Sequence, residues 1–310
     1  MIVVLNPNAA GGKALQKWVR IEPEMRRRWG RFAVLLSDAA HPLEDRLASL
    51  AGAGETEFVA AGGDGTINAL VHALMVSIPE GRRAPIAIGA IGLGSSNDFH
   101  KPVGPKRYIA GIPCALAFPS AARRDVGVLG FRSDHKEGDR HFLINASAGI
   151  TAEANRLFNI PDGMLLRLKR GSARGAILSA AALAMLGFAD IPAILQIDNG
   201  SRRSVRLSNL AVLKSPHISG DLMYPGGPGY DSGCFTVALL RGAGRLARLR
   251  LFHALMHGRL PHTDAIETWT ASTVTLAAEI PFPVEFDGEV ILANAARFSV
   301  LPQHLKVCTC

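Results

Sequence analysis

The strongest chemical signal in the sequence is a glycine-rich string, Gly62-Gly63-Asp64-Gly65-Thr66, between an apolar run and a helical pattern. Its glycines allow a sharp turn and a close approach of the backbone to a ligand. The start of a helix offers free N–H groups and a positive dipole end, which suit phosphate. An acid there implies a cation or a proton to be moved, so Asp64 is a magnesium-linked residue or a base. A plain glycine-rich turn capped by Asp64 is the alternative.

Two further loops have a similar composition. Asn6-Pro7-Asn8-Ala9-Ala10-Gly11-Gly12-Lys13 follows the first apolar run, and Gly92-Leu93-Gly94-Ser95-Ser96-Asn97-Asp98-Phe99 follows a later one. Their amides, hydroxyls and lysine could contact phosphate or base oxygens, and their glycines admit close approach. Neither loop is a Walker A motif, because Gly-Lys-Ser/Thr is missing. An ordinary turn would explain either loop alone, but not three such loops at one edge of a sheet.

The elements that must position these loops alternate along the first third of the chain. The apolar runs predict strands at 2–5, 32–36, 57–61 and 85–91, and the patterns between them predict helices at 13–25, 39–51 and 66–77. Such alternation implies a parallel sheet with right-handed crossovers. Ligands bind at the carboxyl ends of parallel strands, so the three loops should meet there. The expected fold class is α/β, with an N-terminal nucleotide-binding domain.

After Asp125 the pattern changes to short strands, predicted at 142–148, 193–198, 205–213, 234–240 and 272–277. Turn residues near most of them are typical of antiparallel hairpins and sandwiches. Two helical insertions are expected, at 164–188 and 241–259. We therefore expect an α/β domain at 1–126 and a β-rich domain at 127–295, with 296–310 packing back on the first; the family resemblance described next implies that the first binds ATP and that the second is a β-sandwich-like substrate domain.

Taken in order, these strings resemble the diacylglycerol kinase catalytic-domain family, which includes sphingosine kinases, ceramide kinases and bacterial soluble lipid kinases. The three loops resemble its Asn-Pro-x-Ser-Gly, Gly-Gly-Asp-Gly-Thr and Gly-Thr-x-Asn-Asp-Phe elements, with Ser95 replacing threonine. Further matches are Arg123 to Gly127, Phe142 to Ile150, a degraded copy at Asp231 to Val237, and Phe286-Asp287-Gly288-Glu289. Gly-Gly-Asp-Gly-Thr alone is less specific, because NAD kinases and phosphofructokinases share it. The matches nevertheless run from residue 6 to 289.

The resemblance implies a kinase that uses ATP and Mg²⁺, with its active site in the cleft between an NAD kinase/phosphofructokinase-like domain and a β-sandwich-like domain. Asp287 would be the general base with Glu289 beside it, and Asp64 is a rival base. Asp98 and Asp125 would support an acidic network near magnesium. The residues assigned to ATP are Asn6, Pro7, Asn8, Gly11, Gly12, Lys13, Gly62, Gly63, Asp64, Gly65, Thr66, Asn68, Gly94, Ser95, Ser96 and Asn97.

Some positions depart from the family pattern. Asp-Gly is also a very common hairpin turn, which is the alternative for Asp287-Gly288. Some bacterial members hold a structural magnesium, for which Asp221 and Asp231 are the candidates here, although the loop spacing around them differs. His100-Lys101 replaces the usual Ala-Arg after Phe99. Because these changes lie partly where the acceptor would bind, we expect an unusual substrate, and the sequence does not name it.

Bulk composition limits the partners. The chain has 310 residues, 48% hydrophobic and 19% charged, with a formal net charge of +8. That charge favours anionic partners, and basic amphipathic helices at 164–188 and 241–259 suggest peripheral contact with an anionic membrane at its inner face. Core-facing helices with solvated arginines are the alternative. Only 6% aromatic residues and no stacking motif argue against nucleic acid. The four cysteines have no zinc or disulfide spacing, which fits a cytoplasmic protein.

Three functions are consistent with the sequence. The first is a lipid kinase acting on diacylglycerol, a sphingoid base or a related alcohol. The second is an NAD kinase-like phosphotransferase, although its Asn-Glu nucleoside motif is not evident downstream of the glycine-rich string. The third is an inactive nucleotide- or lipid-binding member, against which the retained acids argue. A homodimer is left open.

Overall fold

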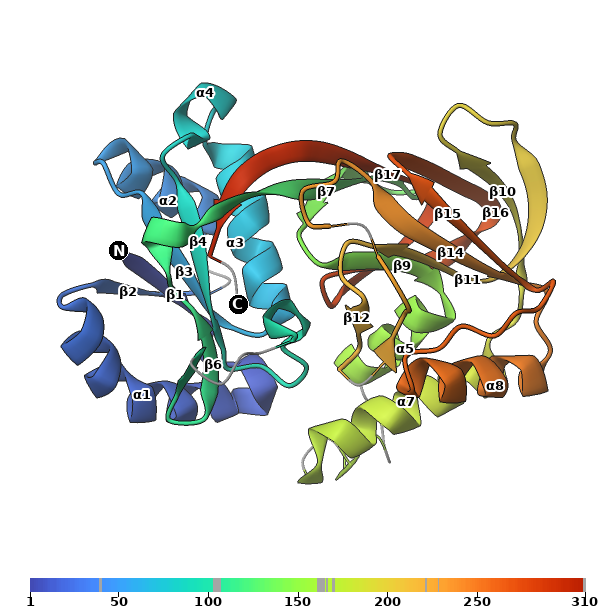
Figure 1. Cartoon of the computed structure of the whole chain (residues 1–310), viewed down its shortest axis with the longest axis horizontal. Helices are drawn as coiled ribbons and strands as arrows, with labels where there is room; N and C mark the ends of the chain where they lie inside the picture. The colour runs from blue at the N-terminus through green and yellow to red at the C-terminus, as the bar shows by residue number, and fades with distance from the viewer. Residues whose placement is uncertain are drawn as a thin grey trace. The chain divides into compact units, whose positions relative to one another are not determined.

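The structure, a computed structural model, describes residues 1–38, 41–102, 107–160, 165, 167–168, 171–220, 222–227 and 229–308, with backbone alone for 173 and 174. Two units can be distinguished: Met1–Arg124 with Gln303–Cys310, and Asp125–Pro302 (Figure 1). The sequence analysis placed the boundary between its two domains at residues 126 and 127.

Short apolar runs form the parallel sheet of the first unit. Its strands are β1 (Ile2–Leu5), β2 (Ala33–Leu36), β3 (Glu57–Gly62) and β4 (Ala87–Gly92). Their order is β4-β3-β1-β2, and each neighbouring pair is parallel. Every residue of β1 and β4 is buried, as expected for strands covered on both faces. The last residues of β17 (Glu289–Val307) extend this sheet by pairing parallel to β4.

Helices cover both faces of this sheet. Helix α1 (Lys13–Trp29) packs Trp18, Ile21 and Met25 against one face. Helices α2 (Leu43–Gly52) and α3 (Asp64–Ser77) pack against each other over the opposite face, as right-handed crossovers require. A short helix, α4 (Glu80–Arg83), precedes β4, and a hairpin of β5 (Tyr108–Ile109) and β6 (Ile112–Ala115) pairs antiparallel to its far end. The short 3-10 turns are η1 (Ala9–Gly12), η2 (Asp98–His100) and η4 (Phe118–Ser120).

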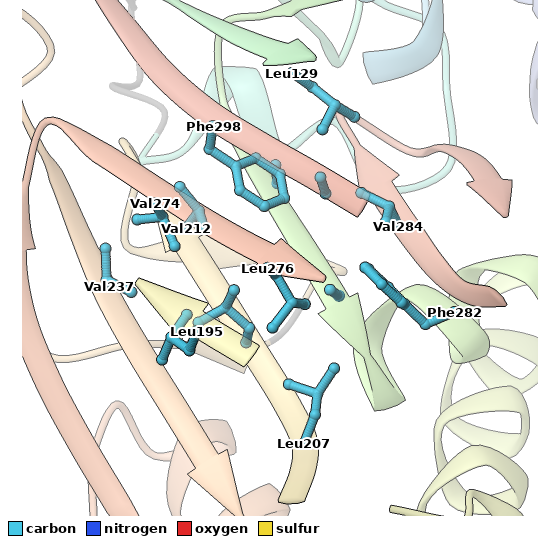
Figure 2. Close-up of a cluster of buried hydrophobic side chains, with 14 of the residues drawn as sticks. Leu129, Leu195, Leu207, Val212, Val237, Val274, Leu276, Phe282, Val284 and Phe298 are labelled. Carbon is cyan, nitrogen blue, oxygen red and sulfur yellow. The ribbon is translucent and has the colours of Figure 1, made fainter. Parts of the chain in front are cut away.

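The second unit is built from antiparallel strands. They are β7 (Ala122–Arg132), β8 (Glu137–Phe142), β9 (Asn145–Gly149), β10 (Ile191–Ile197), β11 (Arg203–Leu213), β14 (Phe235–Arg241), β15 (Ile266–Ala271), β16 (Thr273–Phe286) and β17, with a small hairpin of β12 (His217–Ile218) and β13 (Leu222–Met223). The order β15-β14-β11-β10-β16-β17 is extended by β9, which pairs with both β11 and β16, and by the β7–β8 hairpin, which joins through β17. Alternate side chains such as Leu276, Phe282 and Phe298 point into one apolar cluster (Figure 2). This packing gives the sandwich-like core expected from the short strands.

Three helices lie on one side of the second unit: α5 (Ile150–Asn159), α7 (Ala173–Gly187) and α8 (Arg245–Met256) (Figure 1). Helix α5 follows β9 directly and packs against α7, and the end of α7 packs against α8. The predicted helix at 164–188 thus corresponds to α7, and its first residues lie partly outside the described residues. In the described part of the chain, no helix is both long and apolar enough to cross a bilayer.

One predicted strand is divided in the structure. The sequence predicted a continuous strand at 142–148, whereas β8 ends at Phe142 and β9 begins at Asn145. The interruption has a physical cause, because the backbone N–H groups of Leu143 and Ile144 donate to the carboxylate of Asp287. A ladder partner is therefore replaced by a side chain from a distant turn.

Candidate active site

The three glycine-rich loops meet at the carboxyl edge of the parallel sheet. Because β4, β3 and β1 are neighbours, the segments that follow them leave the sheet side by side. The N–H groups of Leu93 and Gly94 both donate to the carbonyl of Gly62, at 2.8 and 3.0 Å. The N–H of Asn6 donates to the carbonyl of Ala61 at 3.0 Å. The predicted convergence of these loops is therefore present within the first unit.

Two glycines allow the second and third loops to approach this closely. A Cβ on Gly94 would lie only 2.4 Å from the Cα of Gly63, a distance at which the backbone would have to move. A Cβ on Gly63 would lie 3.3 Å from the Cα of Gly94, and a Cβ on Gly62 would lie 2.1 Å from the hydroxyl oxygen of Thr66 in the same loop. Glycine is thus required here by contact with neighbouring atoms, and the loops form a floor with little side-chain cover.

The floor ends at the start of α3. Gly63 is the N-cap of this helix in an extended conformation, and no side chain caps its first turn within the described residues. The first turn of a helix has N–H groups without intrahelical partners and the positive end of the dipole. These are the groups that bind phosphate at helix N-termini. In the first loop, Ala10, Gly11 and Gly12 have positive φ and turn the chain into α1.

Polar side chains brace the three loops. The amide of Asn6 donates to the Thr66 hydroxyl at 3.2 Å, and the Asn97 side chain links Gly92 and Gly94 of its own loop. The ammonium of Lys17 donates to the carbonyls of Leu93 and Gly94, at 3.0 and 3.3 Å. Burial, and then the charge of Lys13, lower the pKa of Lys17.

Lys17 was not among the predicted site residues. A usable signal was present, since Lys17 lies one helical turn after Lys13 and so on the same face of the helix.

Asp64 acts as a brace between two loops. Its carboxylate accepts hydrogen bonds from the backbone N–H groups of Asp98 and Phe99, at 3.0 and 3.1 Å. The Asp98 side chain is itself nearly buried and pairs with Lys101 at 2.7 Å. The structure therefore brings two of the predicted acids, Asp64 and Asp98, together at the edge of the glycine floor.

The third predicted acid, Asp125, belongs to the second unit. It forms an ion pair with Lys214 at 2.9 Å, and both side chains have no exposed area. The same carboxylate oxygen accepts the backbone N–H of Gly233 at 2.8 Å. Burial lowers the pKa of Lys214, an effect that the adjacent Asp125 opposes. Lys214 was not predicted, because no local sequence pattern links it to Asp125, 89 positions earlier.

The late Asp-Gly forms a tight hairpin turn between β16 and β17. Asp287 and Gly288 have φ values of +47° and +90°, as a two-residue turn with left-handed central positions requires. The turn is also held by its own carboxylate. Asp287 is buried and accepts the N–H groups of Leu143, Ile144 and Asn145, at 2.7, 2.9 and 3.1 Å.

This environment bears on the choice of base. Three N–H donors favour the ionised form of a carboxylate and occupy both of its oxygens. Asp287 therefore has the surroundings of a structural anchor, whereas the predicted role was that of a proton acceptor. Glu289, two residues later, keeps a solvent-exposed side chain, yet enough protein surrounds its carboxyl group for burial to raise its pKa.

A second acid, Glu285, also holds this turn through hydrogen bonds. Glu285 is buried in β16, opposite Ser147 of β9. One of its oxygens accepts the N–H of Gly288 at 2.7 Å, and the other accepts the Ser147 hydroxyl at 3.0 Å. Sequence reasoning missed Glu285, whose partner Ser147 is far away in the sequence.

The tentative structural magnesium site cannot be completed from the described residues. Asp221 lies outside them, and Asp231 lies in an exposed turn beside Gly229. Within the described ranges, no three His, Cys, Asp or Glu side chains gather as a metal-binding group.

Two domain families match the chain. Residues 1–126 match the diacylglycerol kinase catalytic domain, and residues 145–309 match the YegS C-terminal NAD kinase beta sandwich-like domain. The second model covers more than half of the chain, so the chain belongs to the YegS C-terminal NAD kinase beta sandwich-like family, with a match to the diacylglycerol kinase catalytic domain in front of it. The resemblance read from the ordered motifs is thereby confirmed, as is the α/β fold with a β-sandwich-like second domain. As a member of this family the chain is a kinase.

Two relatives and one solved structure align with most of this chain. A protein of Chromohalobacter salexigens named "Probable lipid kinase YegS-like" is 27% identical over 254 residues, covering 82% of this chain and 76% of the relative. One of Pseudomonas fluorescens with the same name is 27% identical over 309 residues, covering 96% and 92%. A crystal structure of a diacylglycerol kinase from Bacillus anthracis aligns with a TM-score of 0.65 at 15% identity, covering 100% of this chain and 96% of that one. At this identity the structural match concerns the fold.

Proposed function

We propose that this kinase transfers the γ-phosphate of ATP to the hydroxyl group of a lipid alcohol, such as a diacylglycerol or a sphingoid base. The observation that carries the proposal is the glycine floor, where Gly63 and Gly94 approach too closely for any side chain beside the open first turn of α3. Such a surface suits a polyphosphate, because backbone N–H groups can reach it directly. The names of the two relatives support a lipid as the acceptor.

The residues of the first unit fit ATP with magnesium. The floor carries no Cβ at Gly62, Gly63 and Gly94, where one would press against the neighbouring loop atoms, so the backbone is left accessible to phosphate oxygens. Asp64 and Asp98 supply the hard oxygen atoms that Mg²⁺ takes, and one or two carboxylates suffice for it. When bound, the ion would neutralise phosphate charge as the transfer proceeds. Asn6, Thr66 and Lys17 keep the loops in place around it.

The residues of the second unit fit the acceptor side. We assign the proton-accepting role to Glu289, whose carboxyl group reaches solvent and has a raised pKa. A base whose pKa lies closer to neutral is better matched to removing a hydroxyl proton. Asp287 and Glu285 then position Glu289 by fixing the turn that carries it. Asp64 remains a rival base, and its two hydrogen bonds to the third loop favour a positioning role.

We further propose that the enzyme works in the cytoplasm and meets its lipid at the inner face of the membrane. The formal charge of +8 would draw the protein towards anionic lipid.

Incubation with γ-labelled ATP, Mg²⁺ and a panel of acceptors tests the proposal. The panel contains a diacylglycerol, a sphingoid base, a ceramide and NAD⁺, and the labelled product is identified by mass spectrometry. The expected result is label in one lipid product, dependent on Mg²⁺. Label in NAD⁺ alone would replace the lipid assignment with the NAD kinase alternative, and no transfer to any acceptor would contradict the proposal.

A further inference from the structure

The outward face of α8 carries a stripe of apolar side chains. Leu246, Leu249 and Met256 lie on one face of the helix and are all exposed, with Leu246 at 72%. The opposite face of the helix buries Arg248, Leu251 and Leu255. A helix that is buried on one side would normally place polar residues on the other. Exposed leucines on the solvent side therefore require a separate explanation.

The end of α7, which packs against α8, also carries exposed leucines. Leu183 and Leu186 of α7 are exposed, whereas Ala184 and Met185 between them are buried. Arg248 of α8 fixes the two helices together, because its guanidinium donates to the carbonyls of Met185 and Phe188. Asp190 completes this anchor by pairing with the same guanidinium. Both helices lie on the same side of the unit (Figure 1).

Charge decides which partner suits this face. Neither α7 nor α8 contains an acidic residue, and Arg245 and Arg250 of α8 are exposed beside the leucines. The acid nearest in sequence to the end of α7, Asp190, is already neutralised by Arg248. Apolar side chains flanked by exposed cations are the pattern of helices that lie on anionic lipid, where leucines enter the acyl boundary and arginines contact headgroups.

We propose that the outer faces of α7 and α8, carrying Leu183, Leu186, Leu246 and Leu249 with Arg245 and Arg250, form the surface that docks on anionic membranes. The inference rests on the proposed function for its purpose, which is to bring the enzyme to a lipid acceptor. It adds the location of the contact and the reason for its preference for anionic lipid. Arg248, the buried arginine of α8, takes no part in lipid contact and instead keeps the two helices in register.

Vesicle co-sedimentation tests the surface directly. Wild type, a Leu246→Asp/Leu249→Asp double variant and a Val19→Asp control are mixed with vesicles of phosphatidylcholine, with and without phosphatidylglycerol. Val19 is a matched control because it is also an apolar side chain on a helix, in the other unit, and is 62% exposed. The expected result is binding of wild type and control to the anionic vesicles, weakened about tenfold or more by the two aspartates. An Arg245→Gln/Arg250→Gln variant should lose most of the preference for phosphatidylglycerol.

Several outcomes would overturn the docking surface. Wild type could bind neither kind of vesicle, or the double variant could bind as well as wild type. A second copy of the chain is the other partner that could cover this apolar face, and light scattering would detect the resulting dimer. A dimer that dissociates in the double variant, without vesicle binding by wild type, would identify the face as a subunit interface and reject the lipid assignment.

A kinase assay separates this inference from the proposed function. With a short-chain diacylglycerol kept below its aggregation limit, the double variant should turn over like wild type, because no membrane is involved. With the same alcohol in anionic vesicles, its rate should fall in parallel with binding. Vesicle binding that depends on Leu246 and Leu249 without turnover of any lipid would reject the proposed function and leave the docking surface standing.

Discussion

Asp287 lies in a motif that was predicted to be catalytic, yet its carboxylate accepts hydrogen bonds from the backbone. Its carboxylate closes the gap between β8 and β9 by accepting three N–H groups, and its left-handed φ makes the turn to Glu289. Asp287→Asn keeps the shape but turns one acceptor into an NH₂ group that faces backbone donors. We expect the variant to lose about 1–3 kcal/mol of unfolding free energy, the range for buried donors left unsatisfied. Urea unfolding followed by circular dichroism measures it, and a loss below 1 kcal/mol would speak against the anchoring role.

Glu289 should show the opposite combination of effects. Glu289→Gln removes the proton acceptor from an exposed site, so turnover should fall by about 10²–10⁴-fold. The unfolding free energy should stay within about 0.5 kcal/mol of wild type, because the side chain is exposed. Steady-state kinetics and urea unfolding of the same preparation give both values. If instead Glu289→Gln stayed active while Asp287→Asn, still folded, was inactive, the base would be Asp287.

The pH dependence of the reaction follows from the same residue. Burial raises the pKa of Glu289, so its carboxylate forms only above the range of an ordinary glutamate. A base must be ionised, and kcat/KM is therefore expected to fall as the pH decreases through that raised pKa and to level off above it. The residual activity of Glu289→Gln should lack this acidic limb. Turnover of wild type that is flat down to the ordinary glutamate range would contradict the assignment.

At the scale of elements, the glycine floor depends on the distance between two loops. Gly94→Ala would place a Cβ 2.4 Å from the Cα of Gly63, so the loops after β3 and β4 must separate. We expect ATP affinity to fall by at least about tenfold, since misplacing a binding group by an ångström has effects of this size. Isothermal calorimetry with Mg–ATP measures it. Gly52→Ala is the control, because a Cβ at Gly52 meets no atom within 4 Å, and unchanged affinity in both variants would refute the floor.

The elements also differ in how far the sequence predicts them. Strands β1, β3 and β4 were predicted to within two residues at each end, because a strand covered on both faces is apolar throughout. The β8 strand, Glu-Gly-Asp-Arg-His-Phe, and the long β17 were missed, since their residues alternate between solvent and core without a strong apolar signal. Helix α5 was missed because it follows β9 with no polar break, beginning directly after Gly149.

Local sequence patterns predicted one part of the candidate site, whereas the other part depends on contacts between residues far apart in the sequence. The three loops were found because glycine, asparagine and hydroxyl residues cluster locally after apolar runs. Lys214 and Glu285 were not found, because each acts through a partner far away in the sequence: Asp125 for Lys214, and Ser147 for Glu285. Local patterns can indicate which residues contact a ligand. They carry no information about the buried partners that hold those residues in place.

At the scale of the whole molecule, the proposed function assigns each unit a part of one reaction. The first unit would supply the glycine floor and its acids, and the second would supply the turn with Glu289. Hydrogen exchange can test this division without any acceptor. Mg–ATP should slow exchange most in the loops around 63–67 and 93–98, whose N–H groups and loop contacts would become protected. The amides of 143–145 provide an internal reference, because Asp287 already holds them and should protect them equally with and without nucleotide.

Other outcomes of the exchange experiment would each contradict a different part of the proposed nucleotide site. Protection confined to the second unit would move the nucleotide site away from the glycine floor. Protection at the floor that did not require Mg²⁺ would remove the reason for placing Asp64 and Asp98 beside the phosphates, because two carboxylates repel an uncompensated triphosphate. If three turns at one sheet edge bind a metal-neutralised triphosphate, exchange should be slow at 63–67 and 93–98. This slowing should require both nucleotide and metal.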